Sequence, residues 1–236
     1  MSPASEIVVQ YFAAARELAG VEEERVRVPS ASLEARQVWA LLAEAHPKLA
    51  PFAARMRLAV NDELVELDAL VHAGDRVAVL PPVAGGAGEA AGTDANVTCA
   101  LRDTPLSLDE AMRLVAHPSA GGIAMFVGVV RDHADGKPVA RLDYESHAAL
   151  AQKQLQRVAA EVVAAHPGTR LCALHRVGSL RVGDLAVIVA TSAAHREQAF
   201  VTCRLAIERI KAEVAIWKKE WDTEGAAHWV NLEPKR

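Results

Sequence analysis

Short apolar runs and longer amphipathic stretches follow one another along the chain, which predicts a mixture of strands and helices. In the first third, β-branched and aromatic runs bounded by turn residues predict strands at residues 7–12, 25–28, 58–60, 64–67 and 76–80. Between the second and third strands, Ser32 is expected to cap a helix that runs to about residue 45. Glu22, Glu23 and Glu24 are expected to form a solvated loop. The resulting order is ββα followed by ββ and a last strand that leads directly into residues 81–86.

The remainder of the chain alternates strands with longer helices. Strands are predicted at residues 97–101, 123–130, 142–146, 171–177, 185–191 and 216–221, and helices at residues 107–117, 148–165 and 195–214. In the last helix, apolar residues recur at spacings of 3, 4, 3 and 4 and predict a stripe facing the core. The stripe consists of Phe200, Cys203, Ile207, Ile210 and Val214. Strands and helices in this order predict an α+β fold class.

A sequence without hydrophobic periodicity separates the two parts. Residues 81–86 read PPVAGG, where two prolines fix φ and two glycines lack Cβ atoms. The small and polar residues 87–95, AGEAAGTDA, predict a flexible linker. We therefore predict a first domain at residues 1–86, a linker at 87–95 and a second domain at 96–236.

Composition excludes several classes of protein. The 236 residues are 51% hydrophobic with a formal charge of −4, which argues against a nucleic-acid-binding or polybasic membrane protein. The charge divides into −4 for residues 1–86 (8 basic, 12 acidic), −2 for 87–95 and +2 for 96–236 (18 basic, 16 acidic). No apolar run is long enough for a membrane span and no secretory leader is recognisable, so a cytoplasmic protein is expected. The three cysteines and nine histidines lack ligand spacing, and we predict reduced cysteines and no metal site.

Five basic residues of the second domain are candidates for an anion-binding pocket. Arg131 follows a buried strand, His195 and Arg196 begin a helix, and Lys211 and Lys218 flank the turn that follows that helix. Taken singly, each is more often a solvated surface residue, but together they predict a cationic pocket. In an extended IWKKEW segment, Lys218 and Lys219 face opposite ways, so Lys219 is predicted to lie outside the pocket.

The end of the first domain carries a family resemblance. The segment VNDELVELDALVHAGDRVAVLPPVAGG resembles the ubiquitin-like sulfur carriers, specifically the small (MoaD-like) subunit of molybdopterin synthase. This resemblance implies a β-grasp fold and a terminal glycine whose carboxylate is adenylated and converted to a thiocarboxylate. In this chain Gly85 and Gly86 are internal.

The second domain resembles the large, MoaE-like subunit of molybdopterin synthase over nearly all of residues 96–236. The matching strings are FVGVVRDH, LDYESH, HRVGSLRVGD, TSAAHREQAF and IKAEVAIWKKE. The resemblance implies an α/β hammerhead-type fold and a homodimer. It also implies that Lys211 and Lys218 are essential lysines and that Arg131, His195 and Arg196 bind substrate. Ala215 stands where the family usually has proline, and we expect this change to loosen the turn into Lys218.

Together the two resemblances imply a fused molybdopterin synthase. Sulfur would pass from a Gly86 thiocarboxylate to cyclic pyranopterin monophosphate, without a metal or other cofactor, after a separate enzyme has adenylated and sulfurated Gly86. Because activation requires a free carboxylate, cleavage between Gly86 and Ala87 is expected. Two alternatives remain: a non-catalytic carrier or interaction fusion, and a sulfur carrier for another pathway such as thiazole synthesis.

Overall fold

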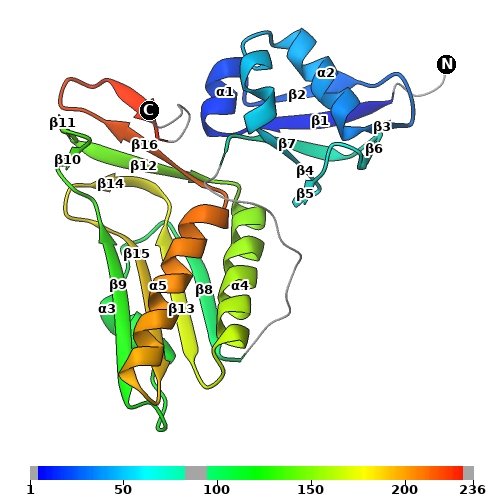
Figure 1. Ribbon diagram of the computed structural model, residues 1–236. Coiled ribbons are helices and arrows are strands. Elements are labelled where there is room, and N and C mark those ends of the chain that lie inside the picture. Colours follow the sequence, from blue (N-terminus) through cyan, green and yellow to red (C-terminus); the bar gives the residue numbers. More distant parts are fainter. Residues whose placement is uncertain (1–4, 83–94, 231–236) are drawn as a thin grey trace. The chain divides into compact units, whose positions relative to one another are not determined.

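The structure is a computed structural model that describes residues 5–82 and 95–230, and the chain divides into two units after Pro82 (Figure 1). The first unit contains β1 (Glu6–Tyr11), α1 (Ala13–Ala19), β2 (Glu23–Arg27), β3 (Ser32–Glu34), α2 (Ala35–Ala45), the 3-10 helix η1 (Ala50–Arg55), β4 (Arg57–Val60), β5 (Glu63–Val65), β6 (Leu70–His72) and β7 (Arg76–Leu80). Gly85, Gly86, Ala87 and nearly all of the expected linker lie outside the described residues.

One mixed sheet organises the first unit. Its five strands lie in the order β2-β1-β7-β4-β5, with β1 and β7 parallel at the centre and the other neighbours antiparallel. Alternate residues of β1 are buried, and they pack with the apolar face of α2 in a core that includes Val9, Val38, Leu42 and Val79. The β-grasp fold expected for this part of the chain is therefore confirmed.

Two local expectations for this unit are wrong. Ser32 lies in β3 and does not cap α2; Glu34 does, because its side chain and that of Gln37 form a reciprocal capping box. Glu23 and Glu24 belong to β2, where Glu24 accepts a hydrogen bond from the Tyr11 hydroxyl at 2.6 Å. The charge of Glu23 and Glu24 suggested a loop, but pairing with β1 extends β2 through both residues.

The second unit contains two four-stranded sheets. Its elements are β8 (Val97–Arg102), α3 (Leu108–Val115), β9 (Gly122–Val129), β10 (His133–Ala134), β11 (Lys137–Pro138), β12 (Arg141–Ser146), α4 (Ala148–Ala165), β13 (Arg170–Arg176), β14 (Gly178–Arg181), β15 (Leu185–Ala193), α5 (Arg196–Glu213), β16 (Ile216–Trp221) and β17 (Ala227–Trp229). One sheet has the order β8-β13-β15-β9 and the other β14-β12-β16-β17. Strands and helices thus share this unit, as the α+β prediction requires.

Helices cover both faces of the first of these sheets. In Figure 1, α4 and α5 lie side by side on one face, and α3 lies behind the strands. Alternate residues of β13 and β15, including Cys172, Leu174 and Ile188, pack toward α3. The residues between them face α4 and α5, as the hydrogen bond from the Cys203 thiol of α5 to the carbonyl oxygen of Val189 illustrates. His175 belongs to this second set and so faces the side of the two long helices.

The predicted stripe of α5 is correct except at one position. Cys203, Ile207, Ile210 and Val214 are buried, but the side chain of Phe200 is 62% exposed. All three cysteines are free, and burial raises the pKa of Cys172 and of Cys99 to about 12. In the part of the chain that the structure describes, no helix is long and apolar enough to cross a membrane.

Candidate functional site

A tight turn joins the two elements that carry the candidate lysines. Lys211 lies in the last turn of α5, and Lys218 lies in β16, which starts only three residues after α5 ends. The Ile216 amide donates to the Val214 carbonyl oxygen at 2.7 Å, and this contact closes a three-residue turn around Ala215. This turn fixes the direction in which β16 leaves α5.

Lys211 lies beside an open groove between β9 and α5. Its Nζ is 5.2 Å from the centroid of the Phe126 ring, a cation–π contact. The groove has a volume of about 410 Å³ and is lined by Ala124, Met125, Phe126, Phe200, Cys203, Arg204, Ile207, Glu208 and Lys211. The exposed Phe200 ring therefore forms part of the groove wall and does not pack in the core.

Lys218 and Lys219 face opposite sides of β16. The Nζ of Lys218 is 2.8 Å from Oε1 of Glu220, two residues further along the same face, and Glu220 is almost fully buried. Lys219 instead places its Nζ 5.2 Å from the ring centroid of Trp221 and 5.3 Å from that of Trp229. The alternation predicted for this segment is confirmed, and Glu220 orients the Lys218 ammonium.

A pair of aromatic residues connects the surroundings of the two lysines. Tyr144 in β12 is the cross-strand partner of Lys218, and its ring meets the His175 ring edge-to-face with centroids 5.1 Å apart. Burial, opposed by the hydrogen bond to the Arg176 carbonyl oxygen and reinforced by the nearby charge of Lys211, lowers the pKa of His175 to about 4. Because the Arg176 carbonyl oxygen only accepts, the 2.8 Å contact requires that Nδ1 of His175 carries the proton. His175 is therefore neutral at pH 7, and its imidazole lies close enough to Lys211 to be affected by that charge.

The pKa of Tyr144 is raised to about 12, first by burial and then by the charge of Glu220. Tyr144, His175 and Glu220 were not predicted as site residues, although each lies within one of the family-like strings LDYESH, HRVGSLRVGD and IKAEVAIWKKE. Their positions on three strands that are distant in sequence become related only through the β12–β16 register and the packing of β12 against β13.

His195 and Arg196 do not join the lysines within one chain. His195 and Arg196 lie exposed at the start of α5, and Lys211 lies 15 positions later, which at 1.5 Å per residue is about 22 Å along the helix. The start of β9 is beside them, because a Cβ at Gly121 would lie only 2.4 Å from the carbonyl oxygen of Ala194. A single cationic pocket made of all five residues is therefore not found in one copy of the chain.

Arg131 lies near the end of β9 that is farther from His195 and Arg196. It follows the last residue of β9 by two positions and is exposed. Since β9 starts beside Arg196 and passes Phe126 next to Lys211, its far end and Arg131 lie on the Lys211 side. Arg131, Lys211 and Lys218 thus belong to one end of α5, and His195 and Arg196 to the other.

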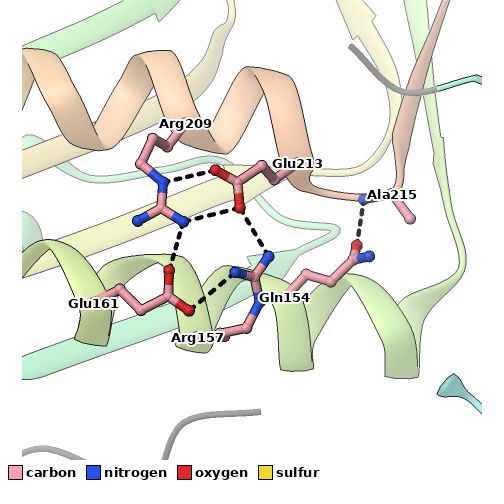
Figure 2. A network of polar contacts seen from close by, with 6 residues as sticks. All are labelled: Gln154, Arg157, Glu161, Arg209, Glu213 and Ala215. Carbon is pink, nitrogen blue, oxygen red and sulfur yellow. Dashed lines mark hydrogen bonds and ion pairs between the residues drawn. The ribbon is translucent and has the colours of Figure 1, made fainter. Parts of the chain in front are cut away.

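A four-residue charge network holds the lysine end of α5 against α4 (Figure 2). Arg157 contacts Glu161 at 3.0 Å and Glu213 at 2.9 Å, while Arg209 contacts Glu213 at 2.6 Å and Glu161 at 2.5 Å. Hydrogen bonds from Arg209, opposed by burial and reinforced by Arg157, lower the pKa of Glu213. Next to this network, Gln154 accepts a hydrogen bond from the Ala215 amide at 2.7 Å. Gln154, Arg157 and Glu161 are spaced by three and four residues and therefore share one face of α4.

No group of three or more histidine, cysteine, aspartate or glutamate side chains that could hold a metal ion occurs within residues 5–82 and 95–230. The chemistry available at the lysine end of α5 is that of the Lys211 and Lys218 ammonium groups, the exposed Arg131 guanidinium and the neutral His175 imidazole, and of these Lys211 also lines the groove. Such groups bind anions and stabilise negative charge that develops during a reaction.

Comparison with known proteins assigns this arrangement to a family. Residues 101–213 match the family described as MoaE protein, and residues 9–86 match the ThiS family. Molybdopterin synthase catalytic subunit 1 of Mycobacterium tuberculosis is 43% identical over 136 residues, which are 58% of this chain and 92% of that protein. The catalytic subunit of Bacillus subtilis is 38% identical over 131 residues, 55% of this chain and 82% of that protein.

A solved structure gives the same result. Molybdopterin synthase from Staphylococcus aureus is 33% identical, covers 55% of this chain and 93% of its own, and superposes with a TM-score of 0.52. The MoaE match and the candidate basic residues both lie in the second unit, while the ThiS match covers the first unit and continues to Gly86. The chain belongs to the molybdopterin synthase family and joins a ThiS-family segment and a MoaE catalytic-subunit segment in one polypeptide.

Proposed function

We propose that this chain supplies both halves of a molybdopterin synthase, which transfers sulfur from a thiocarboxylate on Gly86 to cyclic pyranopterin monophosphate. The observation that carries the proposal is the pair of family matches, because the ThiS match ends at Gly86 and the MoaE match follows it in the same chain. Two sulfur transfers per substrate molecule would produce the dithiolene of molybdopterin.

The lysine end of α5 suits this reaction. A thiocarboxylate is an anionic nucleophile, and fixed cations both hold it and stabilise the negative charge that develops on the substrate. Lys218, oriented by its 2.8 Å contact with Glu220, is the proposed contact for the carrier terminus. Lys211, beside the groove and the Phe126 ring, is its proposed electrostatic or general-acid partner.

His175 would contribute through its protonation state. As a neutral group beside Lys211 it adds no positive charge to repel the lysine, and its Nδ1–H is already committed to the Arg176 carbonyl oxygen. The two ammonium groups would therefore remain the principal cations at the reacting centre. The proposed transfer is polar and requires neither a metal nor an organic cofactor.

The phosphate and pterin would be bound by Arg131, His195 and Arg196. The exposed start of α5 provides unsatisfied amide groups, a favourable dipole and two side chains that bind anions. Since about 22 Å of helix separates Arg196 from Lys211, we propose that a second copy of the second unit places its own His195 and Arg196 next to the lysines. A homodimer through residues 96–236 would then be required for activity.

Sulfur loading is proposed to need cleavage between Gly86 and Ala87. A separate adenylating enzyme consumes a free carboxylate, and the Gly86 carbonyl of the intact chain is part of a peptide bond. Transfer of the sulfur would return Gly86 to a carboxylate, which must be loaded again before the second transfer.

The test compares four proteins with a purified adenylating and sulfur-loading enzyme: the native chain, a two-piece protein ending at Gly86, a matched two-piece protein ending at Ala87, and the Gly86→Pro chain. Mass spectrometry detects the thiocarboxylate, and a pterin assay detects molybdopterin. Only the piece ending at Gly86 and cleaved native chain should carry sulfur and support synthesis.

Full synthesis by an uncut Gly86→Pro chain would overturn the cleavage step. Sulfur loading of the two-piece protein without molybdopterin formation would favour a carrier for another pathway, such as thiazole synthesis. Absence of both loading and synthesis would favour a non-catalytic fusion.

A further inference from the structure

The turn between Lys211 and Lys218 depends on a residue of another helix. Ala215 is the central residue of the three-residue turn closed by the Val214 carbonyl oxygen and the Ile216 amide. Positive φ occurs at four non-glycine residues of the described chain, and Ala215 is not among them. The turn is therefore the inverse γ type, whose central residue has φ near −75°.

This backbone would also accept proline. Proline fixes φ near −65°, close to the value of an inverse γ turn, and the residue before it must be extended. Val214 meets that requirement with φ −92° and ψ 132°. Alanine has a wider range of φ than proline, so the chain needs another means of holding this geometry.

The Ala215 amide supplies that means. It donates to Oε1 of Gln154 at 2.7 Å, and both residues are buried. A proline has no amide hydrogen and could not form this contact. Loss of the acceptor would leave a buried N–H group unpaired, which the folded state avoids by moving the turn or admitting water.

The position of Gln154 is itself fixed. Arg157, one turn further along α4, is 4% exposed and pairs with Glu213 near the end of α5 (Figure 2). The ion pairs thus hold the two helices together directly beside the turn, and Gln154 projects from the held helix onto the Ala215 amide.

We propose that Gln154 is a positioning residue for sulfur transfer: by holding the Ala215 amide it sets the direction of β16 and hence the placement of Lys218 relative to Lys211. This inference rests on the proposed function for its catalytic consequence, but not for the coupling between Gln154 and Ala215. Gln154 takes the place of the conformational restriction that a proline at position 215 would provide.

The experiment is a double-mutant cycle on the two-piece protein ending at Gly86, loaded with sulfur. Gln154→Leu is expected to lower kcat roughly 10- to 100-fold with little change in KM, because the lysines become misplaced while the anion-binding residues are untouched. In the same variant, the hydrogen–deuterium exchange rate of the Ala215 amide should rise about tenfold. Ala215→Pro alone should lower kcat more than about threefold, because the proline Cδ would take the place of the amide hydrogen and overlap the buried Oε1 of Gln154, which lies 2.7 Å from that nitrogen.

Rescue provides the decisive result. In the double variant Gln154→Leu with Ala215→Pro, no donor is left unpaired and φ is fixed, so kcat should return to within about threefold of the starting value. The matched control is Gln152→Leu, since Gln152 lies on the same helix but bonds the Leu101 amide and the Cys99 carbonyl oxygen of β8. Gln152→Leu is expected to leave kcat unchanged, and Ala215→Pro should lower kcat in this variant as much as in the starting protein, because Gln154 is still present.

The proposal would be overturned if Gln154→Leu does not lower kcat. It would also be overturned if the Gln154→Leu chain has the same low kcat with alanine and with proline at position 215. If Gln154→Leu does not fold, Gln154→Met removes the same acceptor with less change of shape and enters the same cycle. The exchange rate of the Ala215 amide needs no substrate. A chain that makes no molybdopterin would therefore refute the proposed function and still reveal whether Gln154 protects that amide.

Discussion

The two ends of α5 are built in opposite ways. At the C-terminal end, Arg209 pairs with Glu161 of α4 and Glu213 pairs with Arg157 of α4, and the following turn is held by Gln154. At the N-terminal end, His195 is the N-cap without a side-chain capping bond, and His195 and Arg196 are exposed. The first end fixes the geometry of its lysines before any ligand arrives, while the second leaves amide groups and cations available to an incoming anion.

This difference suggests a division of labour. Chemistry requires accurate placement of charge, which a rigid surrounding provides at low cost during the reaction. Anion binding at a helix start depends less on accurate placement, because the dipole and several donors act together. We therefore expect substitutions at the C-terminal end to change kcat and substitutions at the N-terminal end to change substrate binding.

The largest expected effect is at the two lysines. Lys211→Ala and Lys218→Ala should each lower the rate of molybdopterin formation roughly 100- to 10,000-fold, the range typical for loss of a charge-stabilising or proton-transferring group. Lys219→Ala is the matched control, because its Nζ contacts the Trp221 and Trp229 rings on the other face of β16. Single-turnover assays with loaded carrier measure the rates; equal losses at Lys218 and Lys219 would contradict the assignment.

Much of this arrangement could be read from the sequence. The bounds of α4 were predicted as found, and the strand alternation that separates Lys218 from Lys219 follows from the two-residue period of an extended chain. Phe200 was placed in the core wrongly, because periodicity identifies which face of a helix is apolar but not whether another element covers it. The short strands β10, β11 and β14 were missed, since two to four residues are too few to show a period.

The rest of the site depends on contacts between distant segments. Arg157 with Glu161 and Arg209 with Glu213 are visible as i, i+4 pairs, but nothing in their spacing reveals that the two pairs also bind each other across two helices. Likewise, Gln154 and the Ala215 amide that it binds are 61 positions apart, so their hydrogen bond becomes visible only in the folded structure. The polar residues at 154, 157 and 161 in an otherwise apolar helix face were the available indication.

The next largest effect tests the rigidity of the C-terminal end. Glu213→Gln removes one carboxylate from the buried guanidinium of Arg157, and the free energy of unfolding should fall by about 2 to 3 kcal/mol, less than for a fully isolated buried pair because Glu161 remains. Glu208→Gln is the matched control. Its partner Arg204 is 81% exposed, so this ion pair should contribute little to the free energy of unfolding. Urea unfolding measures both; equal destabilisation would show that the network does not fix this end.

At the N-terminal end, Arg196→Ala should raise KM for the phosphate-bearing substrate roughly 10- to 100-fold with a smaller change in kcat, the equivalent of losing one guanidinium–phosphate contact. Arg131 lies at the lysine end of α5, but because it is proposed to bind the same anionic substrate, Arg131→Ala should have a similar effect on KM. The folded state should be unaffected because both side chains are exposed. Unchanged substrate affinity in both variants would argue against anion binding by these residues.

Mixing variants sharpens the comparison of the two ends. If a second copy brings its N-terminal end of α5 to the lysines, Lys218→Ala and Arg196→Ala chains mixed into one dimer should form one intact site and recover activity that neither variant dimer has. A mixture that stays at the level of the separate variants would show that each copy uses both ends of its own helix.

The smallest expected effect concerns His175, beside the rigid end. Its pKa is lowered by burial from 6.5 to about 4 in the folded state, so the unfolded chain binds the proton first as the pH falls. Its contribution to stability is present above pH 6.5 and is lost as the pH falls from there toward 4. Between about pH 7.5 and about pH 5 the loss should amount to roughly 2 kcal/mol.

Replacement of His175 by phenylalanine removes the titrating group but keeps an aromatic ring next to Tyr144. Stability of this variant should therefore fall less steeply over the same pH range, even if its stability at pH 7.5 is lower because the Arg176 carbonyl oxygen loses its donor. Below about pH 4.5, Glu161 and Glu213, whose pKa values are lowered, add their own acid sensitivity to both proteins. Urea unfolding at several pH values measures the slopes, and identical slopes above pH 4.5 would mean that folding does not lower the pKa of His175.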